Sequence, residues 1–496
     1  MQPTQPGSLK HRAIWGYSWA QGSHFIMRFS TIIFSMVVSR ILTPDEFGLY
    51  AMSIIGVLLL NIFAGFGLSF AIVREPEVNQ EQLSTIFWVQ LGGNVALFMI
   101  AIPLAFILDD FFSEPEVTHL FLLLSPLFLI NGLVPVQDAL FSREMDYKVF
   151  TYRTLFAETL AAATAITAAL LGAGIYSLVL HALSAASLKA IFIWRISPWR
   201  PTSQFNWKSI ENMWSFGKRI YLNQMIQSIF GQSRTLIFGR LFGADVLGHF
   251  NRASNLNVTV NQLSSGTYTQ LAFSALSRIN TNRESFLDAM KRGLTIKGAL
   301  MVSAIGFFFI AGDAVILLMY GNQWVYAASL FPLLTISGMF GYLGSFIRAS
   351  MEAFGRSDLT LKLQLMFSGS LIAAYAVAYF YGLEAMLYFT AALSVVKLFI
   401  GFSFASNAFG IPFRELFLDS AKLWLLPVGL MLMCRGAVIQ FHFNPWLTAA
   451  GYLLFLILYF RRYYRDSVWN EVGQILAVFS EKTQRMIAGL RAKKRK

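Results

Sequence analysis

Charged residues are scarce in this sequence, and their scarcity excludes a water-soluble fold. Asp, Glu, Lys and Arg make up only 13% of the 496 residues, whereas a soluble domain carries about a quarter. Hydrophobic residues make up 56%, and apolar runs recur from end to end. Each run is long enough to cross a hydrocarbon core about 30 Å thick. The runs are continuous and do not alternate with polar residues, which argues against a β-barrel. The sequence therefore predicts an all-α polytopic membrane protein.

Residues and motifs for covalent or metal chemistry are also lacking. Cys434 is the one cysteine, which excludes an internal disulfide and any thiolate zinc or iron–sulfur site. The six histidines show no metal-ligand spacing. There is no phosphate-binding loop, zinc-protease motif or serine-hydrolase motif. We therefore expect no metal, no cofactor, no nucleotide hydrolysis and no acyl transfer.

The apolar runs predict 14 membrane segments, with 12 as the alternative. The segments are 14–41, 47–72, 84–107, 119–140, 150–171, 175–194, 214–242, 246–273, 292–311, 325–350, 359–381, 383–408, 420–438 and 446–460. The first is expected to be retained, because a cleaved signal peptide would not carry Gln21, His24 and Arg28. Basic residues gather in every second connection, while the 108–118 loop has four acids and no Lys or Arg. By the positive-inside rule, both termini are predicted to be cytoplasmic.

The C-terminal end is strongly basic. Residues 461–496 hold ten basic and three acidic side chains, which accounts for much of the net charge of +13. We interpret them as a cytoplasmic tail that rests on anionic lipid, and nucleic-acid binding is the disfavoured alternative. Apolar residues at helical spacing predict an amphipathic interfacial helix within the tail: Trp469, Val472, Ile475, Leu476 and Phe479.

Two stretches of the chain resemble each other at an offset of 200 residues. Residues 39–50 (SRILTPDEFGLY) align with 239–250 (GRLFGADVLGHF), with identical Arg, Asp and Gly at three positions. Both stretches join two membrane segments on the outer face, where Arg40 and Arg240 are expected to pair with Asp45 and Asp245. An even number of segments separates the copies, so they share one orientation.

Parallel repeats of this kind are a known transporter construction, in which two lobes rock about a central cleft. The repeat predicts an N-lobe at 1–195, a cytoplasmic linker at 196–212 and a C-lobe at 213–410, each lobe with six helices. Two further helices would occupy 411–460, and the basic tail 461–496.

Polar residues within the predicted segments indicate a binding site. Arg28 lies about 21 Å from either end of its segment, too deep to reach water easily. Such a charge could meet an anionic group, or it could form a buried pair with Glu158. Glu158 could instead bind a coupling proton or sodium ion.

Segments 214–242 and 246–273 are rich in amides, which can hydrogen-bond to sugar hydroxyls or link helices to one another. The candidate substrate-binding residues are Gln21, His24, Arg28, Arg219, Asn223, Gln227, Arg234, Asn255 and Asn261.

Five stretches, in order along residues 10–410, resemble the polysaccharide-transporter branch of the MOP exporter superfamily, the Wzx-type flippases. They are SRILTPDEFGLYA (39–51), GFGLSFAIV (65–73), FSREMDYKVF (141–150), GAGIYSLV (172–179) and FGADVLGHFNRA (242–253). The resemblance implies a MATE-like two-lobe bundle in a bacterial inner membrane. It implies alternating-access export of a polyprenyl-diphosphate-linked oligosaccharide for O-antigen, capsule or exopolysaccharide synthesis.

An ion or proton gradient is expected to drive this export. The expected partners are the lipid-linked substrate, anionic lipids and the polysaccharide polymerase or assembly machinery. The alternatives are a multidrug exporter of the same superfamily and, with less support, a membrane-embedded polymerase or ligase.

Overall fold

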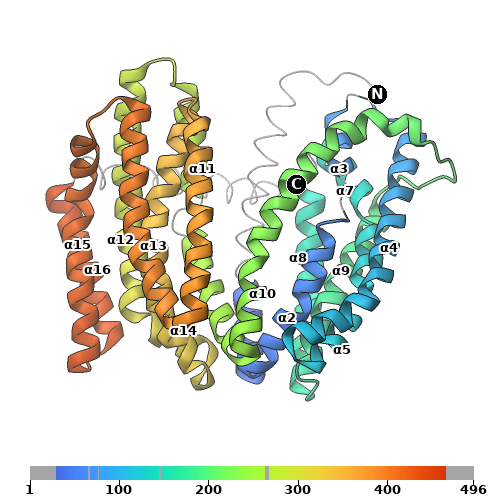
Figure 1. Cartoon of the computed structure of the whole chain (residues 1–496), viewed down its shortest axis with the longest axis horizontal. Helices are drawn as coiled ribbons and strands as arrows, with labels where there is room; N and C mark the ends of the chain where they lie inside the picture. The colour runs from blue at the N-terminus through green and yellow to red at the C-terminus, as the bar shows by residue number, and fades with distance from the viewer. Residues whose placement is uncertain (1–29, 65–66, 76, 145–146, 263–266, 465–496) are drawn as a thin grey trace, which may run out of the picture. The chain divides into compact units, whose positions relative to one another are not determined.

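Helices make up all the regular structure of the part of the chain that can be described. A computed structural model describes residues 30–464 except 65–66, 76, 145–146 and 263–266 (Figure 1). Helices, with short 3-10 turns, are the regular elements in these residues, which confirms the all-α class. The chain divides into two compact units, Met1–Asn251 and Arg252–Lys496. We describe each unit by itself.

Unit 1 is built from helices whose ends follow local sequence signals. It contains the helix Ser30–Ile41, α2 (Pro44–Asn61), α3 (Leu68–Arg74), α4 (Gln80–Phe112), α5 (Pro115–Leu124), α6 (Pro126–Gly132), α7 (Pro135–Arg143), α8 (Tyr147–Leu170), α9 (Tyr176–Ile196), η1 (Trp207–Ile210) and the first part of α10 (Glu211–Asn261). Thr43 and Glu46 form a capping box at the start of α2. The predicted segment 119–140 is divided among three helices, because Pro126 and Pro135 each begin a new one.

Unit 2 contains the last part of α10 and longer helices. These are α11 (Thr267–Arg278), α12 (Arg283–Tyr320), η3 (Asn322–Trp324), α13 (Val325–Ala353), α14 (Ser357–Phe409), α15 (Phe413–Phe441) and α16 (Pro445–Tyr463). Gly382 interrupts α14 with a φ of 86°, a conformation that glycine adopts without steric cost. This break falls at the predicted junction between segments 359–381 and 383–408.

Seven helices in the described part are long and apolar enough to span a membrane. They include α4, α9, α12 and α15, and the long α14 that carries two predicted segments. The chain is a multi-pass membrane protein. The count of 14 segments and the side of each terminus stay predictions.

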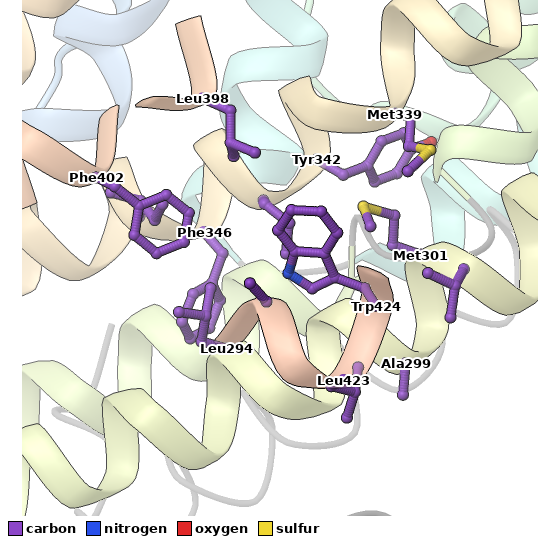
Figure 2. Close-up of a cluster of buried hydrophobic side chains, with 14 of the residues drawn as sticks. Leu294, Ala299, Met301, Met339, Tyr342, Phe346, Leu398, Phe402, Leu423 and Trp424 are labelled. Carbon is purple, nitrogen blue, oxygen red and sulfur yellow. The ribbon is translucent and has the colours of Figure 1, made fainter. Parts of the chain in front are cut away.

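Helices α12, α13, α14, α15 and α16 all contribute side chains to the hydrophobic core of unit 2. Figure 2 shows the indole of Trp424 directed into a cluster that includes Met301, Tyr342 and Phe346. Tyr452 of α16 donates a hydrogen bond to the carbonyl oxygen of Val302 at 2.9 Å. Helices α15 and α16 therefore share this core and do not merely lie beside it.

Two ion pairs fasten α15 to α12. Lys291 Nζ lies 2.7 Å from Glu415 Oε1, and Arg435 Nη1 lies 3.0 Å from Asp313 Oδ2. The two residues on each helix are about 30 Å apart along its axis. The pairs thus fix α15 against α12 near both ends.

The segment between α9 and α10, predicted to be a linker, is bound tightly to α4. Gln80 Nε2 donates to the carbonyl oxygen of Arg200 at 2.7 Å, and Trp88 Nε1 donates to that of Thr202 at 2.8 Å. The aromatic rings of Trp199 and Phe87 pack edge to face. This segment is therefore held on unit 1 along its length.

The two copies of the repeated sequence lie against each other in a reciprocal way. A Cβ atom on Gly48 would lie 1.7 Å from the carbonyl oxygen of Ala244, and one on Gly248 would lie 1.9 Å from that of Pro44. Positions 48 and 248 are equivalent in the repeat, and so are positions 44 and 244, so the two contacts are equivalent. Only glycine permits so close a backbone approach at either place.

The pairing expected for Arg240 is wrong. Arg240 Nη1 donates to Ser113 Oγ at 2.9 Å, and Asp245 lies 3.7 Å from His249 Nε2. Burial raises the pKa of Asp45, and the nearby carboxylates of Asp245, Glu116 and Glu46 raise it further. The acids of the two copies therefore repel one another where the backbones meet.

We expect Gly48→Ala and Gly248→Ala to lower stability, because over-packing costs about 1–3 kcal/mol. The thermal midpoint of the detergent-solubilised protein is measured by heating samples and then quantifying the remaining folded protein by fluorescence-detected gel filtration. Gly92→Ala on α4 is the matched control, since a Cβ there would have no neighbour within 4 Å. Equal midpoints for Gly48→Ala and Gly92→Ala would contradict the contact.

We expect acid to stabilise unit 1 through Asp45. The folded state raises the pKa of Asp45 and so binds its proton more tightly than the unfolded chain. The free energy of unfolding then rises as the pH falls through this titration. Asp45→Asn should flatten the dependence of the thermal midpoint on pH. An unaltered pH dependence in Asp45→Asn would refute this assignment.

Candidate functional site

The predicted substrate-binding residues fall into three groups in the structure. Gln21, His24 and Arg28 lie outside the described residues. Arg219, Asn223 and Gln227 belong to α10, but their side chains are outside the described part. Arg234, Asn255 and Asn261 are described in full, and they are the residues on which geometry can be examined.

Arg234 lies on the unit 1 part of α10. Its side chain is exposed, and its guanidinium carbon lies 5.3 Å from the centroid of the Phe250 ring. Gly243, with a φ of 77°, bends the chain between these two residues. The bend brings the ring of Phe250 back over the arginine, where the ring face can stabilise the positive charge.

The amides of α10 in unit 2 have different surroundings. Asn257 Nδ2 donates to the carbonyl oxygen of Leu334 on α13 at 3.2 Å, and Asn261 Nδ2 donates to that of Asn257 at 2.6 Å. A Cβ on Gly338 would lie 3.4 Å from the Asn257 amide. Asn257 thus links two helices, which was the alternative to sugar binding. Asn255 is exposed, and its side chain makes none of these contacts.

Glu158 forms an ion pair within the described part of the chain, and Arg28, named above as a possible partner, lies outside that part. Its Oε1 lies 2.5 Å from Lys189 Nζ on α9, and its Oε2 lies 3.7 Å from His181 Nε2. A second pair joins Arg153 of α8 to Asp138 of α7. In the described residues, the carboxylate of Glu158 is therefore paired with a lysine of the neighbouring helix.

The pairing of Glu158 with Lys189 was missed, although the sequence contained the signal for it. Segments 150–171 and 175–194 were predicted as an antiparallel pair with a short turn. In such a hairpin, residues equally far from the turn lie level with each other, and residues 158 and 189 are nearly so. Opposite charges at matched depth in a membrane hairpin are expected to pair.

Two lysines within the helices of unit 2, Lys297 and Lys397, lie against aromatic rings. Lys297 is 1% exposed, donates to Thr269 Oγ1 at 2.7 Å and lies 5.5 Å from the centroid of the Tyr342 ring. Lys397 Nζ lies 5.4 Å from the centroid of the Phe367 ring. Among the described residues, no group of three His, Cys, Asp or Glu is placed to hold a metal ion.

We expect Asn257 and Asn255 to respond differently to substitution. Asn257→Leu removes the hydrogen bond that links α10 to the carbonyl of Leu334 on α13. It should lower the thermal midpoint, since a hydrogen bond contributes about 0.5–1.5 kcal/mol. Asn255→Leu should leave the midpoint unchanged. Heating followed by gel filtration compares the two, and a larger loss for Asn255→Leu would contradict the assignment.

Solved structures share the fold. The chain matches "Lipid II flippase MurJ, inward closed conformation" with a TM-score of 0.68 at 12% identity, over 89% of this chain and 99% of that one. It matches the inward-facing conformation of a multidrug resistance MATE family transporter of the MOP superfamily with a TM-score of 0.59 at 16% identity, over 76% and 94%. At these identities the likeness shows the fold alone.

Sequence relatives show the family. The lipopolysaccharide biosynthesis protein WzxC of Escherichia coli (strain K12) is 22% identical over 359 residues, 72% of this chain and 73% of the relative. The teichuronic acid biosynthesis protein TuaB of Bacillus subtilis (strain 168) is 22% identical over 475 residues, 92% and 97%. The model of the family described as "Polysaccharide biosynthesis protein" matches residues 37–329. Because this match covers more than half of the chain, the chain belongs to the polysaccharide biosynthesis protein family.

Proposed function

We propose that this protein is a flippase that carries a polyprenyl-diphosphate-linked oligosaccharide across a bacterial inner membrane. The observation that carries the proposal is the family match over residues 37–329 in a multi-pass chain. Its relatives are named for lipopolysaccharide and teichuronic acid biosynthesis and for succinoglycan transport. The first solved structure compared above is titled a lipid II flippase.

The proposal includes a two-lobe architecture. Fourteen helices would form two parallel six-helix repeats plus two C-terminal helices, with both termini in the cytoplasm. The reciprocal contacts of Gly48 with Ala244 and of Gly248 with Pro44 support related repeats, because a two-fold relation makes each contact occur twice. The basic tail 461–496 would rest on anionic lipid and offer a surface to the assembly machinery.

The substrate would be bound by the cationic and amide side chains of the first segment and of α10. Arg28, with Arg219 and Arg234, would face the diphosphate, whose charge must also leave water on the way across. Gln21, His24, Asn223, Gln227, Asn255 and Asn261 would hydrogen-bond to sugar hydroxyls. Arg234 and Asn255 are exposed, as a substrate contact requires. Glu158 would take part in ion coupling.

A multidrug exporter is the second candidate, because the fold is also that of a MATE transporter. The positive charges at the proposed site disfavour it, since a drug cation would be repelled by Arg28 and Arg234. A polymerase or ligase is the third. The family relatives include a protein named for succinoglycan transport, which favours a transporter over these enzymes.

The function is tested by determining which membrane leaflet holds the lipid-linked repeat unit. In cells that lack the protein, we extract this lipid and determine its side by oxidation with an impermeant reagent. Accumulation on the cytoplasmic leaflet with loss of surface polysaccharide is the expected result. Repeat units that reach the outer leaflet but stay unpolymerised would refute the flippase and favour an enzyme.

We expect Arg28→Ala to abolish export and Arg28→Lys to retain part of it, because lysine keeps the charge but loses the bidentate geometry. Surface polysaccharide is measured in cells that carry each variant at equal membrane levels. Arg12→Ala, outside the predicted segments, is the control and should export normally. Normal export by Arg28→Ala would remove this residue from the mechanism.

A further inference from the structure

The imidazole of His181 lies between a carboxylate and an aromatic ring of two other helices. Its Nε2 is 3.7 Å from Glu158 Oε2 on α8. Its ring stacks on Phe34 of the helix Ser30–Ile41, with centroids 4.2 Å apart and planes 17° apart. The histidine on α9 therefore connects the ionic side chains of α8 to the first helix of the described chain.

The charges near His181 balance without it. Glu158 is paired with Lys189, and Asp138 with Arg153. Glu158 and Lys189 are the groups whose charges act on the imidazole. The charges of these two acids and two bases sum to zero. A proton on His181 would therefore give this group of five residues a net charge of one positive unit.

The other elements packed against α9 add little charge beside the imidazole. Helix α6 has no ionisable residue, and on α5 both Glu116 and His119 are exposed. On α7, Asp138 is held by Arg153. The helix Ser30–Ile41 carries Arg40 near its end, where that residue is exposed. Glu158 is thus the carboxylate that can form an ion pair with a protonated His181.

The imidazole of His181 and the carboxylate of Glu158 are close but are not hydrogen-bonded in the structure. A distance of 3.7 Å is too long for a hydrogen bond. Oε1 of Glu158 accepts from Lys189, while among the described residues Oε2 accepts no hydrogen bond. One carboxylate oxygen is therefore available to a charged imidazole that moves closer by less than 1 Å.

We propose that His181 is a proton-binding site of the transport cycle, with Glu158 as its counter-ion and Phe34 as its mechanical link to the first helix. The imidazole takes one proton from water, so that both ring nitrogens carry N–H. Nε2–H then donates to Glu158 Oε2, while Lys189 keeps Oε1. The proton site itself does not depend on the proposed function, but its role in a transport cycle rests on that function.

Because His181 stacks on Phe34, proton binding at His181 also affects the helix Ser30–Ile41. Drawing the imidazole toward Glu158 shifts the ring from Phe34 or pulls the helix Ser30–Ile41 with it. That helix is the end of the predicted segment 14–41, which also carries Arg28. Proton binding at His181 therefore biases the position of the segment that is proposed to hold the diphosphate.

Solid-state NMR of the full-length protein in lipid, with nitrogen-15 in histidine, tests the site directly. The chain has six histidines, so imidazole and imidazolium signals are few. As the pH falls from about 8 to about 5, a signal that is missing from the spectrum of His181→Gln should change to imidazolium, whichever other histidines also change. The matched control His119→Gln, on α5, should keep it. A His181 signal that stays neutral over this range overturns the proposal.

The counter-ion is tested by removing the ion pair as a unit. Glu158→Gln together with Lys189→Met leaves no buried charge unpaired. It should lower the midpoint of the His181 titration, because the carboxylate of Glu158, which stabilises the protonated form, acts on the imidazole more strongly than the opposing charge of Lys189. An unchanged midpoint would exclude Glu158 as the counter-ion.

The link to transport is tested with Phe34→Leu, which leaves every ionisable group in place. We expect export by the unaltered protein to vary with external pH. In Phe34→Leu the NMR titration of His181 should persist, while export should no longer vary with external pH. Export that keeps this dependence overturns the link. Because the NMR titration requires no transport, failure of the flippase function and failure of the proton site give different results.

Discussion

The cost of placing charge inside an apolar bundle dominates this structure. Removing an ion from water costs several kcal/mol even after relaxation, and only a well-placed counter-charge offsets it. Unit 1 meets this constraint with Glu158–Lys189 and Asp138–Arg153, and unit 2 with Asp313–Arg435. A charge that arrives from outside, whether a proton or a diphosphate, must be matched by the protein in the same way.

Close backbone packing is the second constraint. The motif that repeats after 200 residues places Gly48 and Gly248 where a side chain would collide with the partner copy. The acids of the motif, Asp45 and Asp245, repel each other at the same place. A tight contact under electrostatic strain is one that modest forces can open, as the proposed alternating-access cycle would require.

Much of the fold was predictable, because apolar length and glycine or proline position determine it. The break at Gly382 fell where two apolar runs met. The division of segment 119–140 was not predicted, since hydropathy does not register the helix starts at Pro126 and Pro135. Amide composition did not separate Asn257, which links two helices, from the residues proposed to bind sugar. That distinction depends on which carbonyl lies opposite, and a single sequence does not contain it.

We propose that this chain alone moves a lipid-linked oligosaccharide between leaflets. The most direct measurement places the purified protein in liposomes that contain this lipid, extracted from cells that lack the protein. An impermeant oxidant then reports the fraction of sugar exposed outside over time. We expect the exposed fraction to rise beyond that in protein-free liposomes, and to rise little with Arg28→Ala. A fraction equal to that of protein-free liposomes would contradict the proposed function.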